Sequence, residues 1–157
     1  MTSNKRVLLL IGSPKGEKST SASLGNYLIS KLEEFGMISE KLFIHRLVNR
    51  EEKLQELSQI IENVDLIILT FPLYVDSLPA PVIKAMESIK ENRINLELKE
   101  KIDVSYEDIY SDDAKKKYGE LTPPTLIIQD KIIVEGHVPI IKKLARDLFR
   151  VIESLNV

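Results

Sequence analysis

The sequence predicts a single α/β domain with three layers, in which helices cover both faces of a mainly parallel sheet. Two observations lead to this fold class. Residues 1–93 alternate short, unbroken apolar runs with longer stretches of helical periodicity, and parallel strands are usually joined by a crossover helix. Residues 94–157 contain two apolar runs close enough to form a hairpin, followed by a long amphipathic stretch.

The composition excludes several classes of protein. A chain of 157 residues with 43% hydrophobic and 29% charged residues can form one domain with a proper core and is not intrinsically disordered. Its 22 basic and 24 acidic side chains give a net charge of −2, which provides no basic field for nucleic acid. The lack of cysteine excludes disulfides and thiolate chemistry, and no apolar run reaches the roughly 20 residues that cross a bilayer. We therefore expect a soluble cytoplasmic protein without a membrane or nucleic-acid partner.

The first three elements follow the order strand, helix, strand. Residues 7–11 are apolar throughout, as in a strand buried on both faces, and this run ends at Gly12. Apolar residues at three- and four-residue spacing predict a helix over residues 24–35. Gly36 follows it, where a left-handed residue often ends a helix. Residues 41–47 can form the second strand.

The pattern repeats once more before it changes. Periodic apolar residues predict a helix over 54–61, and the apolar run 64–71 predicts a third strand that is closed by Pro72. The next helix begins near Pro81, where the missing N–H of proline does little harm, and continues to about Arg93.

The remaining elements are of a different kind. Residues 94–104 alternate between apolar and polar side chains, which favours a half-exposed strand or strand pair. A short helix is predicted over 106–118. The apolar runs 126–128 and 132–134 form a tight antiparallel hairpin, and a final helix starts at about Pro139. We expect one continuous mixed sheet.

The loop after the first strand is a candidate phosphate site. It lies between a buried strand and a helix N-terminus, where free N–H groups and the helix dipole favour an anion. Lys15 or Lys18 could neutralise charge, and hydroxyl groups add donors without bulk at Ser19, Thr20, Ser21 and Ser23. The loop matches neither the dinucleotide nor the nucleoside-triphosphate glycine motif. The alternative interpretation is that these hydroxyl groups only cap a helix.

Two loops carry motifs that occur together in one protein family. The first is Gly12-Ser13-Pro14-Lys15, followed by the serine and threonine cluster. The second is a Pro-x-Tyr loop that begins at Pro72 and leads through Pro-Ala-Pro into a helix. Together these motifs resemble the flavodoxin-like NADPH-dependent FMN reductases over residues 1–93. In the flavodoxin-like strand order 2-1-3-4-5 both loops would lie at the topological switch point, a common ligand site.

The resemblance implies an FMN cofactor and residues that hold it. The FMN phosphate would be bound by Ser13, Lys15, Ser19, Thr20 and Ser21. The ribityl chain and ring would be lined by Pro72, Leu73, Tyr74 and Val75. NAD(P)H would donate a hydride, a small molecule would accept the electrons, and a homodimer agrees with the family likeness. No side chain need be catalytic, because the cofactor carries the chemistry.

The carboxyl half departs from this family. Residues 94–157 contain no match to the loop of the family's fourth strand. Residues 118–139 instead resemble the carboxyl half of a cysteine-free thioredoxin-like protein, with Pro124 at the usual cis-proline position. The sequence therefore predicts a flavodoxin-like parallel βαβαβα half (1–93) joined to a thioredoxin-like half (94–157) with an antiparallel hairpin and terminal helix, in one domain.

Three functions stay open on the sequence alone. The first is an FMN-binding oxidoreductase that transfers a hydride from NAD(P)H to flavin. The second is a non-enzymatic flavodoxin/thioredoxin fold hybrid, natural or designed, with weak or no flavin binding. The third is a flavin-holding electron carrier without nicotinamide activity. No metal site is expected, because His45 and His137 lack partners at a ligand spacing.

Overall fold

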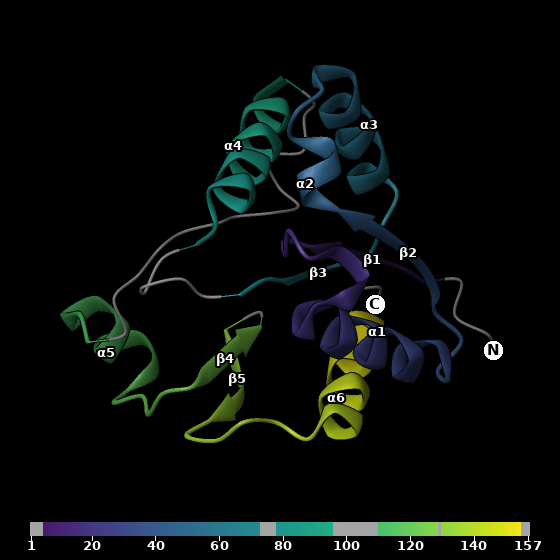
Figure 1. Ribbon diagram of the computed structural model, residues 1–157. Helices are drawn as coiled ribbons and strands as arrows, with labels where there is room; N and C mark the ends of the chain where they lie inside the picture. Colours follow the sequence, from purple (N-terminus) through teal and green to yellow (C-terminus); the bar gives the residue numbers. More distant parts are fainter. Residues whose placement is uncertain (1–4, 73–77, 96–109, 129, 155–157) are drawn as a thin grey trace. The chain divides into compact units, whose positions relative to one another are not determined.

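The computed structural model describes residues 5–72, 78–95, 110–128 and 130–154 (Figure 1). The chain divides into two compact units, Met1–Ile102 and Asp103–Val157, and each is described by itself. Among the described residues, no helix is long and apolar enough to cross a membrane.

The first unit is built on a parallel sheet of three strands. β1 (Arg6–Ile11) lies in the centre, between β2 (Ile38–Phe43) and β3 (Leu66–Thr70). Ile11, the last residue of β1, is paired with the last residues of both neighbours, Phe43 and Thr70. The three strands therefore end at one edge of the sheet. This confirms the predicted parallel α/β arrangement, which is consistent with a flavodoxin-like fold.

Helices cover both faces of this sheet (Figure 1). α1 (Thr20–Glu33) lies on one face, and α2 (Ile44–Leu47), α3 (Glu51–Glu62) and α4 (Ala80–Asn95) lie on the other. Leu8 and Leu10 of β1 pack against α2, α3 and α4, whereas Leu9 faces α1. Because β1 is buried along almost its whole length, each of its leucines contributes about 1.5–3 kcal/mol of transfer free energy.

Two predicted strands differ from the structure. The second strand was expected over residues 41–47, but β2 ends at Phe43 and the chain continues as α2. Ile44 and Leu47 are both buried in the core, because their three-residue spacing places them on one side of a helical turn. In the strand expected over 94–104, Ile94 belongs to α4, and residues 96–104 lie outside the described residues.

The described residues of the second unit form a hairpin and two helices. β4 (Thr125–Ile128) and β5 (Lys131–Glu135) pair antiparallel, which confirms the predicted hairpin. α6 (Ile141–Ser154) confirms the final helix. α5 (Asp112–Tyr118) begins later than the expected residue 106, because the side chain of Ser111 caps it by accepting a hydrogen bond from the Ala114 N–H. Residues 106–109 of that prediction lie outside the described residues.

The bond between Pro123 and Pro124 is cis, the geometry expected at Pro124. The described strands form a three-stranded sheet in the first unit and a two-stranded sheet in the second, and the single continuous sheet stays a prediction. The likeness of residues 94–157 to a thioredoxin-like half, and the single domain, stay predictions.

Candidate functional site

The loop after β1 is held close to the start of α4. The Gly12 N–H donates a hydrogen bond of 2.7 Å to the Thr70 carbonyl, which ties the ends of β1 and β3 together. A Cβ atom at Gly12 would lie only 2.4 Å from Val82 Cγ2. Only glycine therefore allows α4 to approach this loop so closely, and the loops that follow β1 and β3 begin side by side.

The loop then makes a short 3-10 turn, η1 (Gly16–Lys18). The Gly16 N–H donates to the Ser13 carbonyl, and the Ser19 N–H donates to the Gly16 carbonyl, both at 3.1 Å. Gly16 has a φ of +57°, a conformation that costs other residues free energy. Ser13 is buried, and its Oγ accepts a long bond of 3.4 Å from the Lys15 N–H. These bonds fix the shape of the turn from within.

Ser19 is the N-cap of α1. Its Oγ accepts a hydrogen bond from the Ala22 N–H at 3.0 Å and donates one to the Gly16 carbonyl at 2.7 Å. Ser23 Oγ in turn donates to the Ser19 carbonyl at 3.3 Å. The helix-cap interpretation is therefore correct for the Ser19 hydroxyl group, which is already satisfied inside the protein.

The first turn of α1 has backbone N–H groups that could donate hydrogen bonds to an anion. Among the described residues, the N–H groups of Thr20 and Ser21 have no hydrogen-bond acceptor, as is usual for the first residues of a helix. Thr20 is exposed, and so are Lys15 and Lys18 on the turn before it. Two amides, one hydroxyl group and flexible cations at the positive end of the helix dipole suit a phosphate.

The second predicted loop is described only at its ends. Pro72 is half-buried, and Leu73, Tyr74 and Val75 lie outside the described residues. At the other end, the Pro79 carbonyl accepts hydrogen bonds from the N–H groups of Val82 and Ile83, at 2.8 and 3.1 Å. Pro79 thus satisfies two donors at the start of α4, as a rigid helix entry should.

A group of charged and aromatic residues borders the turn on the side of β2. The guanidinium of Arg46 lies 4.8 Å from the centre of the Phe43 ring, a cation–π contact. Lys41 forms an ion pair of 2.8 Å with Glu17 of the turn. The hydrogen bond from Lys41 lowers the pKa of the Glu17 carboxyl group. The sequence did not indicate this cluster, because its members come from a strand, a short helix and a loop.

His45 also lies beside the turn that contains Gly16. Its Cε1 lies 3.8 Å from the position that a Cβ at Gly16 would take. Its Nδ1 is buried and has no hydrogen-bond partner among the described residues, as is also true of Thr70 Oγ1 at the end of β3. No group of three or more side chains that could hold a metal occurs in the described part of the chain.

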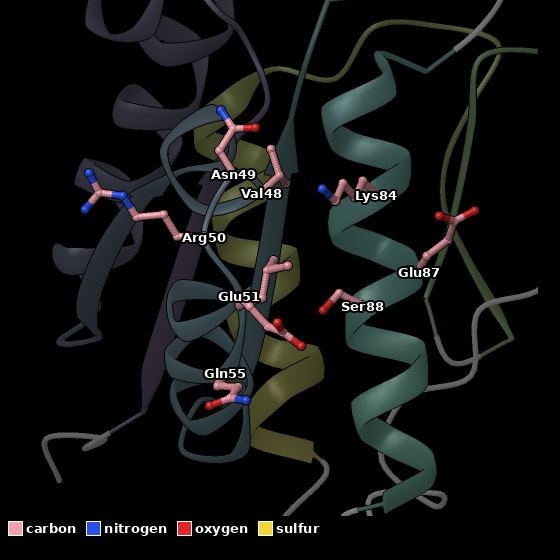
Figure 2. Close-up of a pocket in the computed structure, with 9 residues that line it drawn as sticks. Val48, Asn49, Arg50, Glu51, Gln55, Lys84, Glu87 and Ser88 are labelled. Atoms are coloured by element: carbon pink, nitrogen blue, oxygen red, sulfur yellow. The ribbon is translucent and has the colours of Figure 1, made fainter.

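A groove of about 600 Å³ opens between the start of α3 and α4 (Figure 2). Residues from the end of α2 and the start of α3 line one side, namely Val48, Asn49, Arg50, Glu51, Leu54 and Gln55. Residues of α4 line the other side, namely Lys84, Glu87 and Ser88. The sequence predicted none of them as site residues, although Lys84 lies only three residues after the Pro-Ala-Pro of the second motif.

The side chains of this groove carry both signs of charge. Figure 2 shows the Lys84 ammonium pointing from α4 toward Val48 and Asn49, and the Glu51 carboxylate pointing toward α4. The Arg50 side chain extends away from α4 in the same view. Among the described residues, neither Lys84 nor Glu51 forms an ion pair. Within the part of the chain that the structure describes, the groove therefore offers a ligand one cation and one carboxylate that have no ion-pair partner.

The fold and the loops define an α/β protein whose ligand loops meet at the carboxyl edge of a parallel sheet. The family model described as NADPH-dependent FMN reductase matches residues 5–104, well over half of the chain, and the chain belongs to this family. At family level, this supports a flavodoxin-like FMN oxidoreductase with NAD(P)H as electron donor. Comparisons with curated proteins and with solved structures gave no match.

Proposed function

We propose that the protein binds FMN and transfers a hydride from NAD(P)H to the flavin, from which electrons pass to a small acceptor. One observation carries this proposal. The first turn of α1 has two amides without acceptors in the described structure, at the edge where β1 and β3 end together. A ligand at this place would lie at a topological switch point, where parallel α/β sheets commonly bind their ligands.

The residues expected at the phosphate would play two different roles. Thr20 and Ser21 would bind the phosphate through their N–H groups, with help from the Thr20 hydroxyl group and the Lys15 ammonium. Ser19 would shape the turn, since its hydroxyl group already accepts one hydrogen bond and donates another. Ser13 would keep its O–H as a donor for the phosphate, because its oxygen only accepts a bond, from the Lys15 N–H.

The ribityl chain and ring are assigned by the family resemblance. Pro72, Leu73, Tyr74 and Val75 would line them, from the loop that follows β3. Bound flavin supplies the two-electron chemistry, and the chain has to position it and exclude water. No side chain acts as an acid or base in this proposal.

A flavodoxin/thioredoxin fold hybrid with weak or no flavin binding is the second candidate. The observation that favours it is the capping of α1, in which the hydroxyl groups of Ser19 and Ser23 bond within the protein. In that case the serine cluster would serve the helix alone.

Titration with FMN and with riboflavin separates the two candidates. We expect FMN to bind with a change in flavin fluorescence, and riboflavin, which has no phosphate, to bind more weakly. A ligand at 100 times its dissociation constant stabilises a protein by about 2.7 kcal/mol, which raises the Tm by about 5–10 °C for a chain of this size. Consumption of NADPH, followed at 340 nm, then tests hydride transfer. Equal and negligible binding of both flavins would favour the hybrid.

A further inference from the structure

The groove between α3 and α4 begins close to the proposed flavin site. One side of the groove is lined by the residues that follow α2. α2 starts directly after Phe43, and Phe43 is paired with Ile11 at the end of β1. The other side of the groove starts at Lys84. Lys84 is two residues beyond Val82, the neighbour of Gly12. It lies about 3 Å further along the helix axis and on the opposite, exposed side of α4. Along the axis of α4, the groove therefore starts within one helical turn of the carboxyl edge of the sheet.

The size of the groove suits one end of a nucleotide. Its volume is about 600 Å³, and small-molecule sites usually have about 300–1,000 Å³. It is also strongly polar, because six of its lining side chains carry a charge or an amide and are exposed: Asn49, Arg50, Glu51, Gln55, Lys84 and Glu87. Such a lining favours a hydrophilic ligand over an apolar one.

Lys84 is the cation best placed to receive an anion. Two nearby lysines are already engaged, since Lys41 pairs with Glu17 at 2.8 Å and Lys53 pairs with Glu56 at 2.6 Å. Arg50 also lines the groove, but its side chain extends away from α4 (Figure 2). Arg46 lies over the Phe43 ring. Lys84 has no ion-pair partner in the described part of the chain, and its ammonium points across the groove (Figure 2).

The carboxylate of Glu51 restricts the kind of anion. It points into the groove from the opposite wall (Figure 2) and would repel a ligand that carries only negative charge. A carboxylate can, however, accept a hydrogen bond from a ribose hydroxyl group that carries no phosphate, such as a 3′-OH. The side-chain amides of Asn49 and Gln55 can bond to the edge of a base. A phosphorylated ribonucleoside combines these three kinds of group.

We propose that this groove binds the adenosine end of NADPH and that Lys84 pairs with its 2′-phosphate, so that Lys84 gives the protein its preference for NADPH over NADH. The inference rests on the proposed function, because it names the donor that this same site would use. The 2′-phosphate is the group by which the two donors differ, and a charge-assisted bond to an ammonium is the interaction that would distinguish them.

The direct test uses calorimetric titration of the full chain, without flavin, at low ionic strength, where charge effects are least screened. The probes are adenosine 2′,5′-bisphosphate and adenosine 5′-monophosphate. We expect the unmodified protein to bind the bisphosphate at least tenfold more tightly. Lys84→Gln should remove most of this difference. The control Lys53→Gln, at a half-buried lysine outside the groove that pairs with Glu56, should keep it. Equal binding of the two probes, or equal effects of the two substitutions, would overturn the proposal.

Steady-state kinetics gives a second readout. Lys84→Gln should raise the KM for NADPH about tenfold while the KM for NADH and the Kd for FMN change less than twofold. If FMN binds and NADPH is oxidised but the two donors respond equally to Lys84→Gln, the groove assignment is wrong and the proposed function stands. If FMN does not bind, the proposed function is wrong, and the titration with adenosine 2′,5′-bisphosphate still decides whether the groove takes a 2′-phosphate.

Discussion

Gly12 is the position in the first unit where one added methyl group should have the largest effect. A Cβ there would lie 2.4 Å from Val82 Cγ2 and 3.0 Å from Phe71 Cβ, whereas nonbonded carbon atoms prefer about 3.5–4.0 Å. Val82 is fully buried and cannot turn away without disturbing a close-packed core. Since overpacking typically costs about 1–3 kcal/mol, we expect Gly12→Ala to lie at the upper end of this range.

Urea unfolding measures the effect, and two further variants identify its cause. With a slope of about 2 kcal/mol/M for a protein of this size, the midpoint should fall by about 1–1.5 M. Gly16→Ala is the matched control, because its nearest neighbour would be His45 Cε1 at 3.8 Å. It therefore carries only the cost of a left-handed backbone, about 1 kcal/mol. Val82→Ala removes the clashing methyl groups and should rescue Gly12→Ala.

Two outcomes would contradict a clash with Val82 as the cause of the lost stability. If Gly12→Ala costs no more than Gly16→Ala, α4 does not pack tightly against the loop at Gly12. If the double variant Gly12→Ala/Val82→Ala shows no favourable coupling relative to the two single variants, contact with Val82 is not the cause of the loss.

Three further substitutions have expected outcomes. Ser19→Ala removes the cap of α1 and should cost about 1 kcal/mol in urea unfolding; an unchanged midpoint would contradict the capping role. Lys15→Gln should weaken FMN about tenfold in fluorescence titrations and leave riboflavin unchanged, since a charge-assisted bond is worth about 1.5–3 kcal/mol; equal losses would place Lys15 away from the phosphate. A hydrogen bond from Lys117 lowers the pKa of the Asp130 carboxyl group. A lowered folded-state pKa stabilises the fold above the unfolded value of about 3.9 and loses this effect as the pH falls. Asp130→Asn should therefore reduce the decrease in urea midpoint between pH 5 and pH 3, and an unchanged decrease would show that the pair has no effect.

The order of elements in the first unit could be predicted because a strand that is buried on both faces needs an unbroken run of apolar residues. The run Val7-Leu8-Leu9-Leu10-Ile11 is buried along β1, and an apolar run of this length has few other uses. The end of β2 could not be predicted in the same way. Phe43, Ile44 and Leu47 fit a strand and a helical turn almost equally well, and packing against α3 and α4 decides between them.

The residues of the candidate site could be predicted only in part, for a different reason. The sequence identifies Ser19 as polar and next to a helix, but its hydroxyl group can either cap the helix or bind a ligand, and the Ala22 N–H settles the choice. Glu51 and Lys84 each look like part of a solvated helix face. They face a common groove only because α3 and α4 pack side by side on the sheet, and this information is not local in the sequence.

Gly12 connects the two proposed binding regions, because the lack of a side chain there sets how closely α4 approaches the loop after β1. The turn from Gly16 to Ser19 is placed by that loop, and the groove wall that bears Lys84 is placed by α4. A displacement caused by Gly12→Ala should therefore weaken both FMN and adenosine 2′,5′-bisphosphate. Lys84→Gln should weaken the bisphosphate alone, and Lys15→Gln should weaken FMN alone. If Gly12→Ala impaired one ligand and spared the other, the two regions would not share this support, and the route from the flavin site into the groove would lose its structural basis.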